Sequence, residues 1–360
     1  MTATTKELLN EGLSFFRQQV RPYLQCRGRK PLAEQIREIR RIAPLEESPV
    51  RTYLSRRLYE TKSRGIENYM PKRFVEHFIF DLNSGFPRRG RPGRWEDGRI
   101  GFAIDKVAFW QVMREAGWPT VPVLFASLPD RSWIDGEGEP VSVEHVSSIL
   151  SAGPGGFFVK KRFGYAGQGT GTPDSERALG KVLKRRNLVV QPRFRQHPTM
   201  EALHPGSLNT VRVSTYCDES GVELACAAMR AGRGGAAVDN VSLGGLAVPL
   251  DQNTGVVFHG ASGYAKHEPS MRLYETHPDT GVRFRGFRVP YWDECKDLVT
   301  RVARAMGPGA SIGWDLAIGP DGPCMLEGND RWDPSFMLTH FDLKSTRFGA
   351  AAWRAMIRED

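Results

Sequence analysis

The sequence predicts a mixed α+β protein, because the texture of its 360 residues changes twice along the chain. Residues 5–80 carry apolar side chains at helical spacing, helices and strands alternate from residue 105, and strands dominate from residue 210. A chain of this length can form two or three domains. Its 40% hydrophobic and 25% charged residues are ordinary for a globular protein.

The first 80 residues are expected to be mainly helical. Their apolar residues recur every three or four positions, which is the spacing of one helix face. The residues that carry this pattern are Leu8, Leu9, Leu13, Phe16, Val20, Leu32, Ile36, Ile39, Ile42, Leu54, Leu58, Phe74 and Phe78. A Gly/Pro/Arg-rich stretch at 85–98 then predicts a linker or a surface loop.

Helices and strands are expected to alternate in the middle of the chain. Asp174 is the expected N-cap of one helix, and Pro192 suits the end or an edge of one strand. The predicted helices cover 105–117, 143–151 and 174–186, and the predicted strands cover 121–128, 157–162 and 187–194. A glycine-rich loop at 163–172 follows the second of these strands.

Strands are expected to form most of the remaining chain. They are predicted over 210–216, 222–230, 246–251 and 256–262, and a helix is predicted over 292–306. Two further strands, 311–319 and 323–330, are joined by a Gly-Pro-Asp-Gly turn and predict a hairpin. Residues alternate between the two faces of a strand, so Asp315 lies on the face opposite to the large apolar residues of its strand.

Acidic and amide side chains gather on this hairpin. Met325, Glu327 and Asn329 are expected to share one face of the second strand, where Asp315 of the first strand can meet them. Two carboxylates and an amide oxygen are ligands that suit Mg²⁺. An acid on a strand can equally be a solvated surface side chain, and the pattern alone leaves both interpretations open.

The net charge of +9 lies entirely in the first part of the chain. Residues 1–100 hold 21 Lys and Arg against 12 Asp and Glu, whereas residues 101–360 hold 29 of each. The excess basic residues either form a solvated helical surface or attract an anionic substrate or partner. Nucleic acid is disfavoured because no aromatic residues are interleaved with the basic ones. The basic residues include Arg37, Arg40, Arg41, Arg56, Arg57 and the run at 87–94.

Cysteine usage and hydropathy predict a cytoplasmic protein. The five cysteines are widely spaced and form no CxxC pair, which suits a reducing compartment and argues against structural zinc. No apolar run approaches the roughly 20 residues that span a bilayer. The first residues also lack the basic and apolar regions of a secretory signal.

The loop at 163–172 is either a mobile turn or a loop that binds phosphate. Gly164, Gly167, Gly169 and Gly171 could close backbone amides over a triphosphate, although the spacing is neither a Walker A loop nor a dinucleotide fingerprint. Lys160 ends the preceding strand, where its charge could meet phosphate oxygens or be an ordinary strand-end charge.

An arginine also lies within an apolar strand. Arg212 alternates with Val211 and Val213, so it is either paired structurally or directed at an anion. The stretch at 239–245, DNVSLGG, is either a substrate loop or a turn.

The order of these parts resembles an ATP-grasp enzyme. The segments HPGSLNTVRVST at 204–215, VDNVSLGG at 238–245 and IGWDLAIGPDGPCMLEGN at 312–329 resemble more narrowly the sugar-transfer-associated ATP-grasp family, which is related to α-L-glutamate ligases. The resemblance covers roughly residues 100–340, and the closing Asp…Glu-x-Asn pattern with the HPGSLNTVRV segment is its specific part.

The resemblance implies an α+β ATP-grasp fold, in which two α+β lobes enclose ATP. It divides the chain into a basic, mainly helical region at 1–100, a small lobe with a glycine-rich lid at 101–190, and a large lobe with the metal-binding hairpin at 191–360. The implied cofactors are ATP and Mg²⁺, with Mn²⁺ as a possible substitute.

The resemblance also implies roles for individual residues. Lys106 and Lys160 resemble the lysines that contact phosphates, and Arg212 resembles the residue that supports the transferred phosphate or the acyl intermediate. The lid corresponds to Gly164, Gly167 and Gly169, the adenine-facing hinge to Gln191, and the magnesium ligands to Asp315, Glu327 and Asn329. Asn240 and Arg331 are candidate substrate contacts.

Three features depart from the family pattern. Lys161 stands where a proline often follows the strand lysine, and Gln191 stands where many relatives have glutamate. The first 100 residues are expected to be helical, unlike the α/β substrate domain of many ATP-grasp ligases. The departures leave the details of nucleotide contact and the identity of the substrates open.

The implied activity is ATP-dependent ligation of a carboxylate to an amine through an acyl phosphate. Natural-product or cell-surface sugar and peptide biosynthesis are the contexts that the resemblance suggests. Two alternatives remain at this point, a kinase on the same scaffold and a non-catalytic partner protein.

Overall fold

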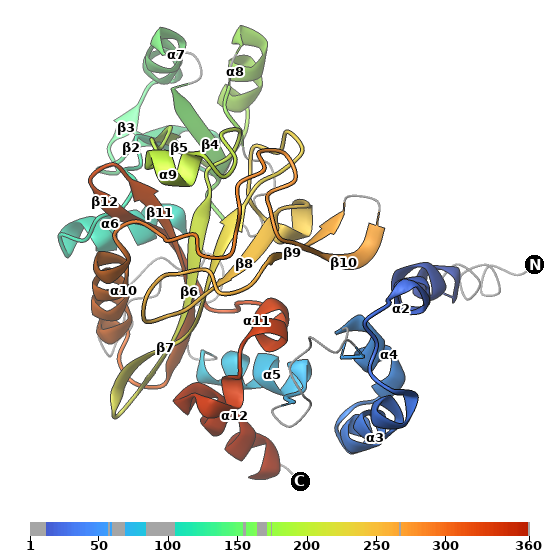
Figure 1. Cartoon of the computed structure of the whole chain (residues 1–360). Coiled ribbons are helices and arrows are strands. Elements are labelled where there is room, and N and C mark those ends of the chain that lie inside the picture. The colour runs from blue at the N-terminus through green and yellow to red at the C-terminus, as the bar shows by residue number, and fades with distance from the viewer. Residues whose placement is uncertain are drawn as a thin grey trace, which may run out of the picture.

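The computed structural model describes residues 12–56, 58–59, 69–83, 105–153, 156–163, 171–173, 175–265 and 268–358. Two antiparallel sheets form the body of the molecule, and helices α2, α3 and α4 form a separate group beside the larger sheet (Figure 1). Within the described residues, no helix is long and apolar enough to cross a membrane.

The smaller sheet has five strands in the order β3-β2-β1-β5-β4. Its strands are β1 (Phe125–Ser127), β2 (Trp133–Asp135), β3 (Pro140–Val141), β4 (Phe157–Lys161) and β5 (Leu188–Pro192). Helices α7 (Val143–Ala152) and α8 (Glu176–Leu183) pack on one face, where Val146 and Leu179 contact the strands. Helix α6 (Lys106–Glu115) covers the other face through Val107 and Trp110.

Serine and aspartate side chains begin these helices. Ser175 caps α8, because its side chain accepts a hydrogen bond from the backbone amide of Ala178. The predicted cap, Asp174, lies outside the described residues. Asp105 caps α6, because its side chain accepts from the Val107 amide at 3.0 Å. Each cap satisfies an amide that the first helical turn leaves without a partner.

The larger sheet has seven strands in the order β10-β9-β8-β7-β6-β11-β12. Its strands are β6 (Thr210–Asp218), β7 (Gly221–Ala231), β8 (Leu246–Leu250), β9 (Ala261–Ala265), β10 (Glu268–Tyr274), β11 (Ala310–Gly319) and β12 (Gly322–Asn329). The predicted strand at 256–262 is correct only at its end, because Val256 and Val257 form single bridges with other segments. Strand β11, between β6 and the edge strand β12, is buried along its whole length, which requires cover on both faces of the sheet.

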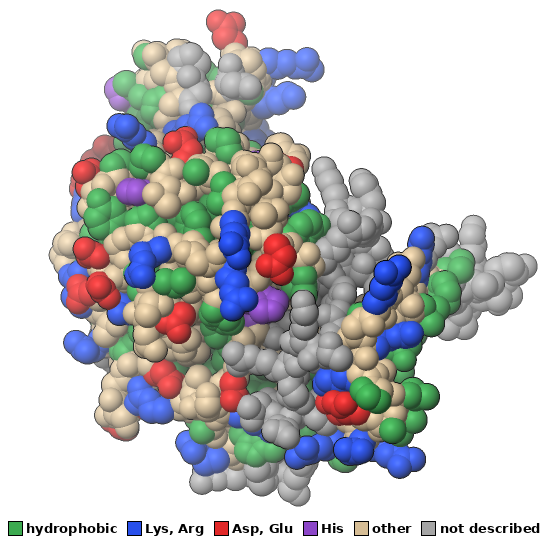
Figure 2. Space-filling view, in the orientation of Figure 1, with side chains coloured by type: hydrophobic (Ala, Val, Ile, Leu, Met, Phe, Trp, Pro, Cys, Tyr) green, Lys and Arg blue, Asp and Glu red, His purple; other side chains and the backbone are tan. Residues whose placement is uncertain are grey.

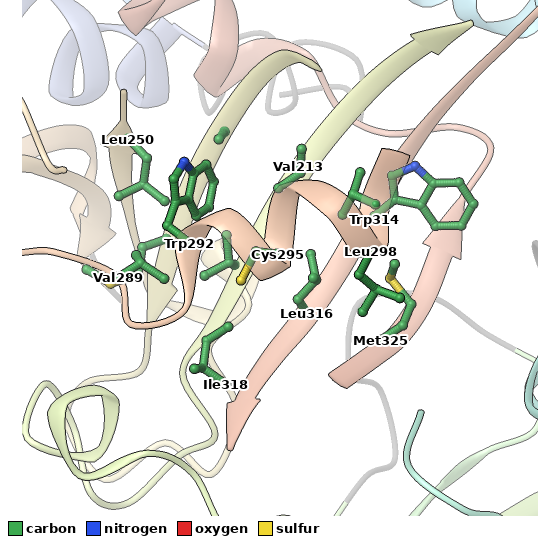
Figure 3. Packing of buried hydrophobic residues seen from close by; sticks show 14 of the residues in the cluster. Val213, Leu250, Val289, Trp292, Cys295, Leu298, Trp314, Leu316, Ile318 and Met325 are labelled. Atoms are coloured by element: carbon green, nitrogen blue, oxygen red, sulfur yellow. The ribbon is translucent and has the colours of Figure 1, made fainter. Parts of the chain in front are cut away.

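Helices supply that cover. Helix α10 (Trp292–Ala305) covers one face, where its Trp292, Cys295 and Leu298 belong to the same buried cluster as Trp314 and Leu316 of β11 (Figure 3). On the opposite face lie α5 (Lys72–Leu82), α11 (Ser335–His340) and α12 (Arg347–Arg358). The short elements α9 (Pro198–Glu201), η4 (Val241–Leu243) and η5 (Leu343–Ser345) connect these parts.

Helix α5 is anchored to the large sheet by one buried side chain. The amide nitrogen of Asn83, the residue after α5, donates to the carbonyl oxygens of Ser311 and Asp330 at 2.7 and 2.6 Å. Its oxygen accepts from the Ser311 amide at 3.2 Å. The last helix of the predicted N-terminal region therefore packs on the large sheet, while the residue limits of the three expected domains stay a prediction.

The remaining N-terminal helices have a core of their own. They are η1 (Phe16–Val20), α2 (Arg21–Gln25), α3 (Leu32–Ile42), η2 (Ala43–Leu45) and α4 (Pro49–Ser55). Ile42, Tyr53, Tyr59 and Tyr69 are buried together between them. The helical prediction for this region is confirmed where the structure describes it, and the predicted linker at 85–98 lies outside the described residues.

The hairpin at the end of the large sheet contains a bulge. Asp315 pairs with Glu327, but the next residue, Leu316, pairs with Met325, so Leu326 is an extra residue in β12. The expectation that Met325 and Glu327 share a face is therefore wrong. Met325 is fully buried in the apolar core, on the side of Leu316.

Candidate active site

A cleft of about 550 Å³ lies between the two sheets. Phe158, Lys160 and Gln191 line it from β4 and β5 of the smaller sheet. Leu326 of β12 and the segment 205–208 line it from the larger part. Ligand pockets typically measure about 300–1,000 Å³, so the cleft has room for a nucleotide-sized ligand.

Three charged residues form a row across neighbouring strands of the larger sheet. Arg212 of β6 pairs in register with Asp315 of β11, and Asp315 pairs in register with Glu327 of β12. Directly opposed residues project to the same face of a sheet. The cation and the two carboxylates therefore lie side by side, and the sequence pattern had placed Asp315 and Glu327 on one surface.

The Asp315 carboxylate lies between two guanidinium groups and is only 3% exposed. Arg212 donates to both of its oxygens, at 2.9 Å in the contact with Oδ2. A terminal nitrogen of Arg230 lies 3.0 Å from the same Oδ2. Burial alone would raise the pKa of Asp315, but Arg212 and Arg230 outweigh it and lower that pKa to about 2. Asp315 is therefore ionised at neutral pH.

Arg230 of β7 was missed by the sequence reasoning. It connects Asp315 to a second buried acid, because its Nε lies 3.6 Å from Asp239 Oδ2. Thr210 joins both, since its hydroxyl accepts from Arg230 at 3.0 Å and its amide donates to Asp239 at 3.0 Å. Burial raises the pKa of Asp239, and Arg230 opposes the rise. The available signal was a single arginine at the end of the apolar segment VELACAAMR.

Both predicted phosphate-contacting lysines approach this row. Lys106, the first residue of α6, places its Nζ 3.6 Å from Glu327 Oε2. Lys160 lines the cleft from β4. Burial, and then the charge of Lys106, lower the pKa of Lys160 to about 8 against the opposing charges of Glu327 and Asp315. Two cations thus face two carboxylates across the cleft.

An ion pair holds the start of α6 in place. Arg162, just after β4, donates from Nε and a terminal nitrogen to the two oxygens of Asp105 at 2.8 and 2.6 Å. A bidentate pair of this kind fixes orientation as well as distance. Because Asp105 also caps α6, the pair fixes the position of Lys106 relative to the strand that carries Lys160.

Gln191, the predicted hinge residue, and the bulge in β12 shape the cleft wall. Gln191 lines the cleft, and its amide nitrogen donates to the carbonyl oxygen of Val121 at 3.0 Å. Leu326 reaches the cleft because the bulge turns it away from the core side of β12. Leu326 was also missed by the sequence reasoning, because a bulge interrupts the alternation on which that reasoning depends.

The predicted lid residues Gly164, Gly167 and Gly169 lie outside the described residues. Gly171 lies just beyond them and is tied to β4 by two backbone hydrogen bonds. It donates to Val159 at 3.0 Å and accepts from Val159 at 2.8 Å. The far end of the glycine-rich segment is therefore attached next to Lys160.

The two candidate substrate residues have different surroundings. Asn240 follows Asp239, which belongs to the Arg230 network, and begins the turn η4. Arg331 is exposed, and its guanidinium lies 4.7 Å from the centre of the Phe80 ring in α5. Asn240 is thus adjacent to the residues that surround the charged row, whereas Arg331 contacts helix α5.

The donor chemistry of the hairpin fits a magnesium ion. Asn329 pairs in register with Gly313, two residues from Asp315, and its amide nitrogen donates to the Gly313 carbonyl at 3.3 Å. Its oxygen and the carboxylates of Asp315 and Glu327 are hard oxygen donors of the kind that Mg²⁺ takes. Within the described residues, no group of three or more His, Cys, Asp or Glu side chains is placed to hold a metal. The predicted set relies instead on two acids and an amide.

Residues 177–344 match the model of the sugar-transfer-associated ATP-grasp family. The chain contains an ATP-grasp domain of this family. The predicted α+β ATP-grasp fold is thereby confirmed, with antiparallel sheets and a helical N-terminal region. The matched residues of the ATP-grasp domain include Arg212, Arg230 and the whole closing hairpin. No curated protein matches the sequence.

Solved structures of ATP-grasp proteins resemble the chain distantly. N5-carboxyaminoimidazole synthase from Aspergillus clavatus, in complex with ADP and an aminoimidazole ribonucleotide, is 10% identical with a TM-score of 0.40 over 71% of this chain and 52% of its own. The synthetase from Staphylococcus aureus with ADP is 14% identical with a TM-score of 0.39, over 66% and 47%. The ATP-grasp ligase PsnB with a minimal precursor, Mg and ADP is 14% identical with a TM-score of 0.35, over 71% and 58%. The chain therefore spans about half the length of these proteins.

Proposed function

We propose that the protein is an ATP- and Mg²⁺-dependent ligase that joins a carboxylate to an amine. The observation that carries the proposal is the row Arg212–Asp315–Glu327, which lies opposite Lys106 and Lys160. Such a site offers cations for a polyphosphate and oxygen donors for a divalent metal in one place. The family match over 177–344 supports the same assignment.

The first step would be transfer of the γ-phosphoryl group. A carboxylate oxygen of the substrate attacks the γ-phosphorus of ATP, the bond to the bridging oxygen breaks, and ADP leaves. Attacking and attacked groups are both anionic, so their repulsion must be neutralised. Lys106 and Lys160 would contact phosphate oxygens, and Arg212 would support the transferred phosphate.

The second step would form the amide bond. The amine nitrogen attacks the acyl carbon, the bond from that carbon to the phosphate oxygen breaks, and the nitrogen loses a proton. Inorganic phosphate and the amide are the products. The leaving phosphate carries negative charge, which the guanidinium group of Arg212 would stabilise. Asp315 holds that guanidinium group in place.

The residues proposed for the metal are Glu327, Asn329 and Asp315. When bound, Mg²⁺ would neutralise phosphate charge and orient the γ-phosphorus for attack. Asp315 already accepts hydrogen bonds from Arg212 and lies within 3.0 Å of Arg230, so most of its acceptor capacity is used. The ion pair of Glu327 in the described part of the chain is the looser one with Lys106, at 3.6 Å. Glu327 is thus the principal ligand in this proposal.

A screen for ADP release over pairs of carboxylates and amines, analysed by mass spectrometry, tests the proposal. A ligase gives ADP, phosphate and a condensed product that has lost one water. A phosphorylated alcohol without an amide would instead show a kinase on the same scaffold. A protein that binds neither ATP nor Mg²⁺ would be a non-catalytic partner, and either result would overturn the proposal.

A further inference from the structure

The N-terminal helices carry a surface that the proposed ligase site does not use. Among the described residues 12–56, seven arginines are exposed, whereas Glu47 is the only exposed acid. The exposed arginines are Arg21, Arg27, Arg29, Arg37, Arg40, Arg41 and Arg51. The positive charge found in the first 100 residues of the sequence is therefore concentrated on the outside of these helices.

Two acids of this region, Glu38 and Glu46, have partners inside the helical group. Glu38 is buried, where it accepts from Lys30 at 2.7 Å and from the hydroxyl of Tyr53. Glu46 is half-buried and accepts from the hydroxyls of Tyr69 and Thr52. These carboxylates are occupied by internal partners and do not neutralise the exposed arginines.

Apolar side chains lie on the same helices and face outward. Leu32 and Ile36, one turn apart on α3, are 65% and 43% exposed, and Leu24 of α2 is 57% exposed. Gln35 of the same helix is buried instead, and its amide donates to the Lys30 carbonyl at 2.6 Å. Helix α3 thus buries Gln35 and Glu38 beside Ile42 but leaves Leu32 and Ile36 on its outer side, where a surface helix usually carries polar residues.

Basic residues flank this apolar stripe. Arg40 follows Ile36 by one helical turn, and Arg37 and Arg41 lie on the neighbouring side of α3. None of these three arginines has an ion-pair partner in the described part of the chain. Hydrophobic and basic side chains are seen next to one another on the helices at the lower right of Figure 2.

We propose that this face of α2 and α3 binds the surface of an anionic lipid membrane. Exposed arginines attract acidic headgroups, and Leu24, Leu32 and Ile36 can enter the boundary between headgroups and acyl chains. A soluble polyanion such as RNA would use the charge but would offer nothing to the apolar side chains. The protein would lie on the membrane, since no described helix could span it.

Flotation of the full-length protein with lipid vesicles tests this proposal. We expect binding to phosphatidylcholine vesicles that contain phosphatidylglycerol, no binding to pure phosphatidylcholine, and release as salt is raised well above ~0.15 M. Absence of binding to the anionic vesicles at ~0.15 M salt would overturn the proposal. Binding to RNA or polyphosphate but not to vesicles would overturn it as well and would identify a soluble polyanion as the partner.

Paired variants locate the binding face. R37Q/R40Q/R41Q should weaken vesicle binding by about fivefold per arginine, and L32S/I36S should weaken it by at least about tenfold. The controls R177Q/R185Q/R186Q and V143S/I149S make matching arginine-to-glutamine and apolar-to-serine changes at exposed residues of the smaller-sheet part and should bind like the unaltered protein. Equal losses in the controls, or unchanged binding by L32S/I36S, would contradict the proposal. All substituted residues are exposed, so the unfolding midpoints of the variants should match that of the unaltered protein. The salt series uses the unaltered protein alone, so its result does not depend on how well any variant folds.

Discussion

At the scale of single residues, the site depends on how four cations share two carboxylates. Arg212 and Arg230 occupy Asp315, whereas Lys106 and Lys160 approach Glu327 and the open cleft. The pairing on Asp315 is buried and fixed, and the lysines keep access to a ligand. In the proposed ligase, Asp315 would hold the two arginines in position, and the lysines would make the first contact with the phosphates.

Lys160 should make ATP binding depend on pH. Its pKa is lowered to about 8, so its positive charge is present at pH 7 and is lost as the pH rises through 8. A bound phosphate favours the charged form, so the Kd for ATP should rise by up to about tenfold per pH unit above 8. Calorimetric titration between pH 7 and pH 9.5 measures this. Lys160→Arg, whose guanidinium stays charged, should flatten the profile; parallel profiles for both proteins would contradict the role of Lys160.

Arg230 should matter through the group that it holds. Arg230→Lys keeps the charge but loses the fork that joins Asp315, Thr210 and Asp239. We expect a fall in the rate of ADP release of about tenfold or more, together with a loss of unfolding free energy of at least about 1–3 kcal/mol, because buried acids lose partners. The exposed Arg285→Lys is the control. An unchanged rate in Arg230→Lys would show that the network is only structural.

At the scale of elements, the closing hairpin shows what the sequence could and could not predict. Alternation along β11 and β12 placed Asp315 and Glu327 on one face, and the register confirms that they are neighbours. Alternation failed at Met325 and Leu326, because a bulge depends on local pairing that a single strand's pattern does not contain. Arg230 was missed for a related reason, since its partners come from β6, β11 and the turn before η4, which only the tertiary fold brings together.

Two glycines of the hairpin allow the two faces of the sheet to be tested separately. A Cβ on Gly313 would lie 2.7 Å from Trp332 and 3.3 Å from Arg212, whereas a Cβ on Gly328 would lie 2.7 Å from the Trp314 ring. Both alanine variants should lose about 1–3 kcal/mol of unfolding free energy from overpacking. Only Gly313→Ala should also slow ADP release, because it displaces Arg212. Equal rates in the two variants would contradict this account of the charged face.

At the scale of the whole molecule, the parts of the chain are connected through the larger sheet. Helix α6 contacts the smaller sheet with one side and the large core with Phe109 and Met113. Asn83 connects the N-terminal side of the chain to β11 and to the residue after β12. The sequence predicted the helical character of the first part, but not that α5 is packed on the large sheet, because amphipathic spacing does not identify the surface that a helix covers.

The Asn83 contact should be important for stability. Asn83→Ala removes a donor to two buried carbonyl oxygens and an acceptor for one amide. We expect a loss of about 2 kcal/mol or more in the free energy of unfolding, seen as a lower denaturant midpoint. The exposed Asn253→Ala should change it by less than about 0.5 kcal/mol. A loss in Asn83→Ala no larger than that of the control would show that α5 is held by its apolar face alone.

The central claim is that Glu327, in register with Asp315 and facing Lys106, makes the cleft a site for ATP and Mg²⁺. Calorimetric titration of ATP with and without Mg²⁺ tests it most directly, on the unaltered protein, on Glu327→Gln and on the control Glu294→Gln in α10. The account predicts that Mg²⁺ strengthens ATP binding in the unaltered protein and the control. In Glu327→Gln, the factor by which Mg²⁺ raises the affinity for ATP should be at least about tenfold smaller. The same gain in Glu327→Gln as in the control, or no ATP binding by the unaltered protein, would contradict the account.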